Sequence, residues 1–189
     1  MDALTETLMS QLSQGGLSAV GQKIGADERT AASALSTAVP LLVAALARNA
    51  STTEGAASLQ QALVKDHDGS ILEHVTDFLG NPEAANGAGI LRHVLGHQQV
   101  TVQQGLSRSL GLESNQIGTL LQIAAPLLMG ALGKQQQQQG FDLGSLASFL
   151  GGQQQAVQQS NPDIMSLLTG KQSGLSGILG LLSKLFGGR

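Results

Sequence analysis

The chain has 189 residues, enough for one domain, or two small ones, with a substantial hydrophobic core. It contains no Cys, Trp or Tyr and only four Phe. The lack of cysteine excludes disulfides, thiolate metal ligands and cysteine nucleophiles. The scarcity of aromatic rings and the net charge of −3 indicate that nucleic acid is not a partner, because nucleic-acid binders need stacking platforms for bases and positive charge for phosphates.

The N-terminal residues 1–6 carry two acids where a secretory signal would carry Lys or Arg. The longest apolar stretch, residues 38–47, is ten residues long and includes Pro40. A membrane-spanning helix needs roughly 20 apolar residues. We therefore expect neither a targeting segment nor a spanning segment, and a cytoplasmic protein.

An amphipathic helix is predicted after Asp27. At about 100° per residue, the apolar residues between 31 and 46 fall on one arc, whereas Ser33 and Thr37 lie outside it. Asp27 stands where an N-cap acid would satisfy the free N–H groups of the first turn. Pro40 interrupts the hydrogen-bond pattern of such a helix, so a bend or a helix–helix junction is expected there.

Two short amphipathic helices are predicted in the middle of the chain. The pattern Ile-Leu-x-His-Val occurs at residues 71–75 and again at residues 90–94, and a Leu-Gly pair follows each copy. Glycine after an apolar run is a common helix C-cap, so each helix should stop there.

The apolar stripe of residues 31–46 recurs 86 residues later in the chain. The matching segments are residues 24–27 with 110–113 and residues 38–46 with 124–132. The match places Pro126 at the position of Pro40. Two copies are too few for a solenoid, so the duplication predicts two related helical units packed into one body.

The fold class predicted is all-α and multihelical. Leu and Ala together number 54 residues and Val and Ile only 16, a ratio that favours helix over sheet. The duplicated domain is expected over residues 1–151, with one unit at about 4–80 and the other at about 90–151. A flexible Gln/Gly-rich linker at 152–173 and a short amphipathic, basic C-terminal helix at 174–189 should follow.

The duplicated Gly-x-acid and Ala-x-Pro-Leu-Leu pattern, together with the two Ile-Leu-x-His-Val elements, resembles the bacterial DUF937 family, which is related to the YidB-like proteins. The resemblance covers residues 4–151. It implies a compact multihelical fold with no established activity, and it therefore assigns no functional residue.

The histidines are the first candidates for chemistry. His93 and His97 are four residues apart, which on one helix would give metal-ligand spacing. A group within eight residues could complete a site: His67, Asp68, Glu73 and His74. Zinc proteases carry Glu directly after the first His, where this chain has Val94, and Gly96 should end the helix before His97. We therefore expect structural histidines and no metal, cofactor or catalytic residue. A metal protein or enzyme using His74, His93 and His97 is the least favoured alternative.

Other chemical motifs are missing or incomplete. No Gly-x-Ser-x-Gly elbow follows a strand, and no Gly-rich loop is followed by Lys-Ser or Lys-Thr. The turns within residues 20–31 and 108–113 have the outline of a helix-turn-helix. The helices that follow, however, are rich in Ala and Leu and lack the polar or basic side chains with which a recognition helix contacts DNA. The sequence thus predicts neither an enzyme nor a DNA-binding protein.

The C-terminal segment has a distinctive pattern. Its apolar residues lie on one arc at helical spacing: Leu175, Ile178, Leu179, Leu181, Leu182, Leu185 and Phe186. Lys171, Lys184 and Arg189 make the segment basic, and no acid follows Asp163. One interpretation is a helix docked on its own domain or on a neighbouring subunit. The other is weak contact with a membrane surface through residues 174–186.

The function predicted from the sequence is a non-catalytic helical module that acts through protein–protein contacts or self-association. Residues 1–85 carry a net charge of −6 and residues 86–189 a net charge of +3, an asymmetry that would let the halves attract each other or let two copies pair head to tail. The alternative is a peripheral membrane protein anchored by its C-terminal segment.

Overall fold

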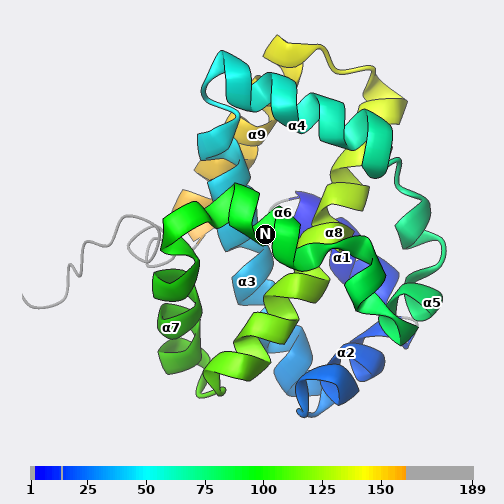
Figure 1. Cartoon of the computed structure of the whole chain (residues 1–189), viewed down its shortest axis with the longest axis vertical. Helices are drawn as coiled ribbons and strands as arrows, with labels where there is room; N and C mark the ends of the chain where they lie inside the picture. Colours follow the sequence, from blue (N-terminus) through cyan, green and yellow to red (C-terminus); the bar gives the residue numbers. More distant parts are fainter. Residues whose placement is uncertain (1–2, 14, 161–189) are drawn as a thin grey trace, which may run out of the picture.

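A computed structural model describes residues 3–13 and 15–160 of the chain (Figure 1). The predicted segment at 174–189 and residues 161–173 of the predicted linker lie outside the described residues. The α-helices are α1 (Ala3–Leu12), α2 (Gly16–Ile24), α3 (Glu28–Asn49), α4 (Thr53–Asp66), α5 (Val75–Gly80), α6 (Gly87–Leu95), α7 (Gln99–Leu110), α8 (Ser114–Gln139) and α9 (Leu143–Ser160). Short 3-10 turns are η1 (Ser70–Leu72), η2 (Pro82–Ala85) and η3 (Gly96–Gln98). No strand occurs in the described ranges, which confirms the all-α class.

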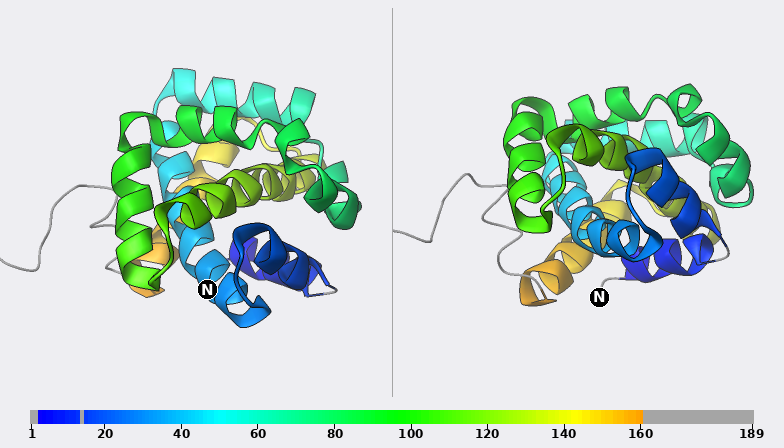
Figure 2. Two further views of the ribbon diagram at one scale, coloured as in Figure 1. Left: turned by 60° about the horizontal axis from the view of Figure 1, so that its bottom comes forward. Right: turned by 90° about the horizontal axis from the view of Figure 1, so that it is seen from below.

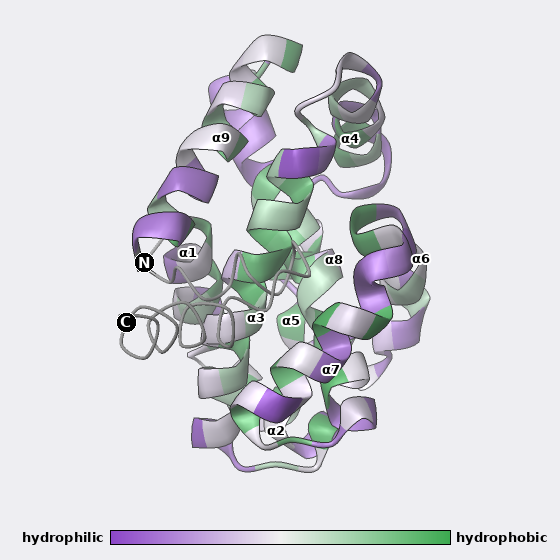
Figure 3. Cartoon of the chain, turned by 90° about the vertical axis from the view of Figure 1, so that its left-hand side faces the viewer, coloured by the Kyte–Doolittle hydropathy of each residue, from purple (hydrophilic) through white to green (hydrophobic). Residues whose placement is uncertain are grey.

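The two longest helices, α3 and α8, run through the middle of the molecule, and most of the other helices pack on them (Figure 2). Every residue from 38 to 47 in α3 and from 123 to 133 in α8 is buried. Over these turns the helices are enclosed on all sides, so they have no solvated face to show. Figure 3 shows apolar residues concentrated on α3 and α8, with hydrophilic residues on outer helices such as α9.

Both prolines lie inside continuous helices, Pro40 in α3 and Pro126 in α8. Because proline has no N–H, Pro126 leaves the carbonyl of Gln122 without its helical donor. Gly87, the first residue of α6, packs so closely on this carbonyl oxygen that a Cβ would overlap it. The proline of α8 therefore marks the place where α6 lies against it.

Both long helices begin where the sequence predicts. Gly25 and Gly111 end the preceding helices with φ of 69° and 67°, a left-handed conformation that favours glycine. Asp27 then caps α3, its carboxylate accepting a hydrogen bond from the Thr30 backbone N–H at 2.8 Å. The bonds from Thr30 stabilise the charged form of Asp27 and lower the pKa of its carboxyl group.

The start of α8 is tied to the end of α2 by one side chain. Glu113 and Gln116 form a capping box, in which the Glu113 backbone N–H donates to Gln116 Oε1 at 2.8 Å. The side-chain amide nitrogen of Gln116, Nε2, also donates a hydrogen bond to the Ile24 carbonyl oxygen at 2.7 Å. The corner before α3 and the corner before α8 are thereby held together.

Two predicted segments differ from the structure. Residues 71–75 do not form one short helix: η1 ends at Leu72, and α5 begins only at Val75. Residues 152–160, predicted as linker, continue α9, and Val157 is buried in the core. Glutamine is a good helix former, and one apolar anchor is enough to hold these last turns on the domain.

By length and composition alone, α3 and α8 are apolar enough to cross a membrane, although the sequence led us to expect no such segment. Of their most apolar windows, 72% and 78% are buried inside the fold. Core helices of soluble proteins pass the same test, so two such helices are weak evidence for a membrane protein.

The contact of Gly87 with α8 leads to a first prediction. Gly87→Ala should lower the free energy of unfolding by about 1–3 kcal/mol, because the added methyl group overlaps the Gln122 carbonyl oxygen and forces α6 away. In the control, Gly152→Ala in α9, the new Cβ meets no atom, and the higher helix propensity of alanine should raise stability by about 0.5–1 kcal/mol. Urea unfolding measures both changes; equal effects of the two substitutions would contradict the tight α6–α8 contact.

Candidate functional site

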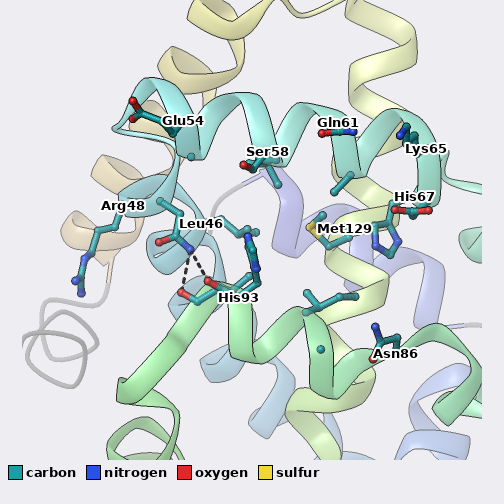
Figure 4. Close-up of a pocket in the computed structure, with 18 of the residues that line it drawn as sticks. Leu46, Arg48, Glu54, Ser58, Gln61, Lys65, His67, Asn86, His93 and Met129 are labelled. Carbon is teal, nitrogen blue, oxygen red and sulfur yellow. Dashed lines mark hydrogen bonds between the residues drawn. The ribbon is translucent and has the colours of Figure 1, made fainter.

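A cleft of about 750 Å³ lies between α4 and α6 (Figure 4). Its floor is apolar: Leu46 comes from the end of α3 and Met129 from α8, and Leu59 and Ile90 contribute from the two walls. Figure 4 shows polar side chains such as Ser58 along the α4 wall. The cleft thus combines an apolar floor with a polar rim, as small-molecule and peptide binding sites usually do.

Two smaller hollows continue this cleft at its ends. The hollow of about 210 Å³ shares Arg48, Asn49, His93 and Val94 with the cleft and extends to Gln98. The hollow of about 390 Å³ shares Asp66, His67, Asn86 and Ile90 with it and extends to Ser70 and Ala84. The three hollows together form one elongated depression, which we call the α4–α6 groove.

The α4 wall follows from the spacing of its residues. Glu54, Ser58, Gln61, Ala62 and Lys65 recur at helical intervals and therefore share one face of α4, the face that lines the groove. The hydroxyl of Thr52 caps this helix by accepting a hydrogen bond from the Gly55 backbone N–H at 3.1 Å.

The α6 wall is fixed at both of its ends. At its start, Gly87 packs on α8. At its end, the side-chain amide of Asn49 donates to the Val94 carbonyl at 3.0 Å and to the His93 carbonyl at 3.3 Å (dashed in Figure 4). The last carbonyls of a helix have no partner within it, so a donor from α3 both satisfies them and anchors α6.

His67 lies at the end of α4, half-buried, where the cleft meets the 390 Å³ hollow. Desolvation lowers the pKa of His67 below its ordinary value, although the charges of Asp66 and Asp68 act in the opposite direction. The carbonyl oxygen of His67 packs directly on Gly133 of α8, where a Cβ would overlap it. This contact seats the far end of α4 on the central helix.

The structure brings two of the three predicted histidines to the groove and leaves the third outside it. His93 is exposed on α6, His97 is exposed in η3 beyond the Gly96 that ends α6 as predicted, and both line the 210 Å³ hollow. His74 precedes α5, with its Nδ1 3.8 Å from the Asp77 carboxylate, and does not line the groove. Among the described residues, no three His, Asp or Glu side chains gather closely enough to hold a metal ion.

Sequence reasoning missed the groove itself and two of its residues, Asn49 and Met129, and it considered His67 only as a possible metal ligand. One signal was available: Asn49 is a polar residue at the end of a helix whose preceding turns are almost wholly apolar. Such a residue is often kept for a specific hydrogen bond. Nothing in the spacing of Met129 marks it out.

Comparison with known proteins places this fold in a family. The model of a bacterial protein family of unknown function, DUF937, matches residues 6–135. The chain belongs to the DUF937 family. No curated protein and no solved structure matches it. All residues that line the α4–α6 groove of this DUF937 protein lie within residues 6–135, the part of the chain that matches the family model.

The lowered pKa of His67 predicts how stability depends on pH. The unfolded chain binds a proton at His67 near pH 6.5, whereas the folded chain binds it only at lower pH, so acidification favours unfolding. Stability should therefore fall as the pH is lowered from about 7.5 to about 5.5, and His67→Gln should reduce this fall.

The measurement is the urea midpoint of both proteins across that pH range. The matched control is His97→Gln, at an exposed position in η3, which should leave the wild-type slope in place. An unchanged slope in His67→Gln would contradict the role assigned to burial of His67.

Proposed function

We propose that this DUF937 protein is a non-catalytic, cytoplasmic binding module that acts through protein contacts, and that the α4–α6 groove is its contact surface. The observation that carries the proposal is the elongated groove between α4 and α6, which has an apolar floor and polar side chains along its rim. Such a groove accepts the apolar face of an amphipathic helix and leaves the polar face of that helix between the walls.

The lining of the groove supports this mode of binding. Ile90 and Val94 are half-buried in the free protein, so an incoming helix would remove their remaining apolar surface from water. Met129, buried in α8, closes the base of the groove between the two walls. The rim carries both signs of charge, with Glu54 and Lys65 on the same wall, which suits the mixed polar face of a helix.

The walls of the groove are held before any partner arrives. Asn49 and Gly87 fix the two ends of α6, and the contact of His67 with Gly133 fixes the end of α4. A preformed surface binds without the entropic cost of ordering its own elements.

We also infer that the domain descends from two related helical units. The same device occurs twice: a glycine in the left-handed region, an acidic cap, then a long helix with an interior proline. The packing of both proline helices into one core supports a duplication within a single body.

The second candidate function is contact with a membrane surface through residues 174–186. The observation that favours it is the combination of an apolar arc with Lys171, Lys184 and Arg189 in a stretch free of acids. Flotation of the full chain with anionic vesicles would support it; failure to float at low salt would count against it.

Photo-crosslinking tests the proposed function directly. A benzophenone amino acid replaces Ala62 inside the groove, and in the matched control it replaces Val64, which is 66% exposed on the same helix but does not line the groove. After illumination of living cells, position 62 should form several-fold more adduct with another polypeptide chain than position 64, and mass spectrometry should map the adduct to an amphipathic helix. Equal yields, or adducts at neither position, would refute the groove as the contact surface.

A further inference from the structure

We propose that residues 174–186 of the same chain occupy the α4–α6 groove, so that the protein covers its own contact surface. This inference rests on the proposed function of the groove. The segment lies outside the described residues. Its sequence, the shape of the groove and the position of the end of α9 support the proposal.

The apolar spacing of the segment fits a helix bound in a groove. Leu175, Ile178, Leu179 and Leu182 follow the i, i+3, i+4, i+7 pattern of anchor residues, and Leu185 and Phe186 extend it by another turn. As a helix, residues 174–186 would be about 20 Å long. The α4 wall has 14 residues and a length of about 21 Å, so wall and segment match in length.

The described surface offers this apolar face few other places to bind. Its exposed large hydrophobic side chains are Val64, Val100 and Leu143, each on a different helix and none of them lining the groove. Isolated apolar residues of this kind are ordinary surface features. The groove floor, by contrast, brings Leu46, Met129 and Ile90 together in one continuous depression.

The chain is long enough to reach the groove. Thirteen residues separate the end of α9 from residue 174. Extended at roughly 3.3 Å per residue, they span up to about 43 Å, which is comparable to the diameter of a domain of this size. In Figure 1 the last turns of α9 lie on the left, the side on which Figure 4 places the Arg48 end of the groove. We therefore expect the segment to enter at Arg48.

Charge complementarity favours the same direction. A segment that enters at Arg48 places Lys184 and Arg189 toward the opposite end of the groove. There Asp66 and Asp68 are both exposed, and Lys65 is exposed beside them, which leaves an excess of one acid. The basic end of the segment would then lie against the end of the groove where acids outnumber lysine.

Self-occupancy would regulate access to the groove. A ligand tethered to its own binding site has an effective concentration in roughly the millimolar range, so an outside helix must displace it before binding. The groove would then respond only to partners that bind more tightly than the tethered segment, or to conditions that release the segment.

A spin label tests the proposal on the intact protein. The chain has no cysteine, so Ser183→Cys accepts a single nitroxide, on the polar side of the apolar arc. In the ¹⁵N-labelled full chain, this label should broaden the amide signals of Lys65 and Asp66 more than those at the Arg48 end. A label at Ser176→Cys should give the reverse.

Two substitutions that introduce the same charge distinguish binding of the segment through its apolar face from mere closeness of the segment to the groove. With the label at residue 183, Leu182→Asp should abolish the broadening because it places a charge on the apolar face. Ser176→Asp, on the polar face, should leave the broadening in place.

Mixing distinguishes the alternatives. In a mixture of spin-labelled ¹⁴N chain with unlabelled ¹⁵N chain, the groove signals should stay sharp. Broadening that appears only in this mixture would overturn the proposal, because the occupant would be the segment of a second copy. Sharp groove signals in every sample would also overturn it, as would a label that responds only to added anionic vesicles. Neither result would affect crosslinking of Ala62 to another chain, which tests the groove as a contact surface independently.

Discussion

The complete burial of α3 and α8 is the constraint on which the rest of the structure depends. From residue 38 to 47 and from residue 123 to 133, neither helix has a side open to water. Other helices must therefore cover both, and α1, α2, α4, α6 and α7 all pack on α8. Small residues make this close packing workable in a chain almost without aromatics, because glycine lets one backbone approach another. The approach to a neighbouring carbonyl oxygen is tightest at Gly133, Gly55 and Gly87.

The groove is a consequence of this covering arrangement. Both α4 and α6 lie on α8, one seated through His67 and the other through Gly87. The groove lies between them, and the buried side chains of Leu46 and Met129 form its base. Since both walls are anchored to the buried helices, the groove is part of the framework and not a feature of loose surface loops. This is why we place binding there.

Local signals in the sequence predicted the helix boundaries and the all-α class. Glycine followed by an acid marks a backbone turn and a cap, both of which depend on neighbouring residues alone, and Gly96 ended α6 before His97 for the same reason. The glutamine-rich residues 152–160 were assigned wrongly because composition was read as flexibility, whereas the buried Val157 holds them on the core. The groove could not be predicted, because it depends on how α4 and α6 pack on α8, which no local pattern in the sequence records. Nor could the burial of His67, which is set by the packing of α4 on α8.

Native-state hydrogen exchange of the full chain tests the shared core most directly. If α3 and α8 form one buried unit, the amides of residues 41–47 and 127–133 should be the slowest in the protein. Their opening free energies should agree with each other and with the free energy of global unfolding. Markedly different opening free energies for the two helices would show that each belongs to a separate unit, and would contradict the framework on which the groove depends.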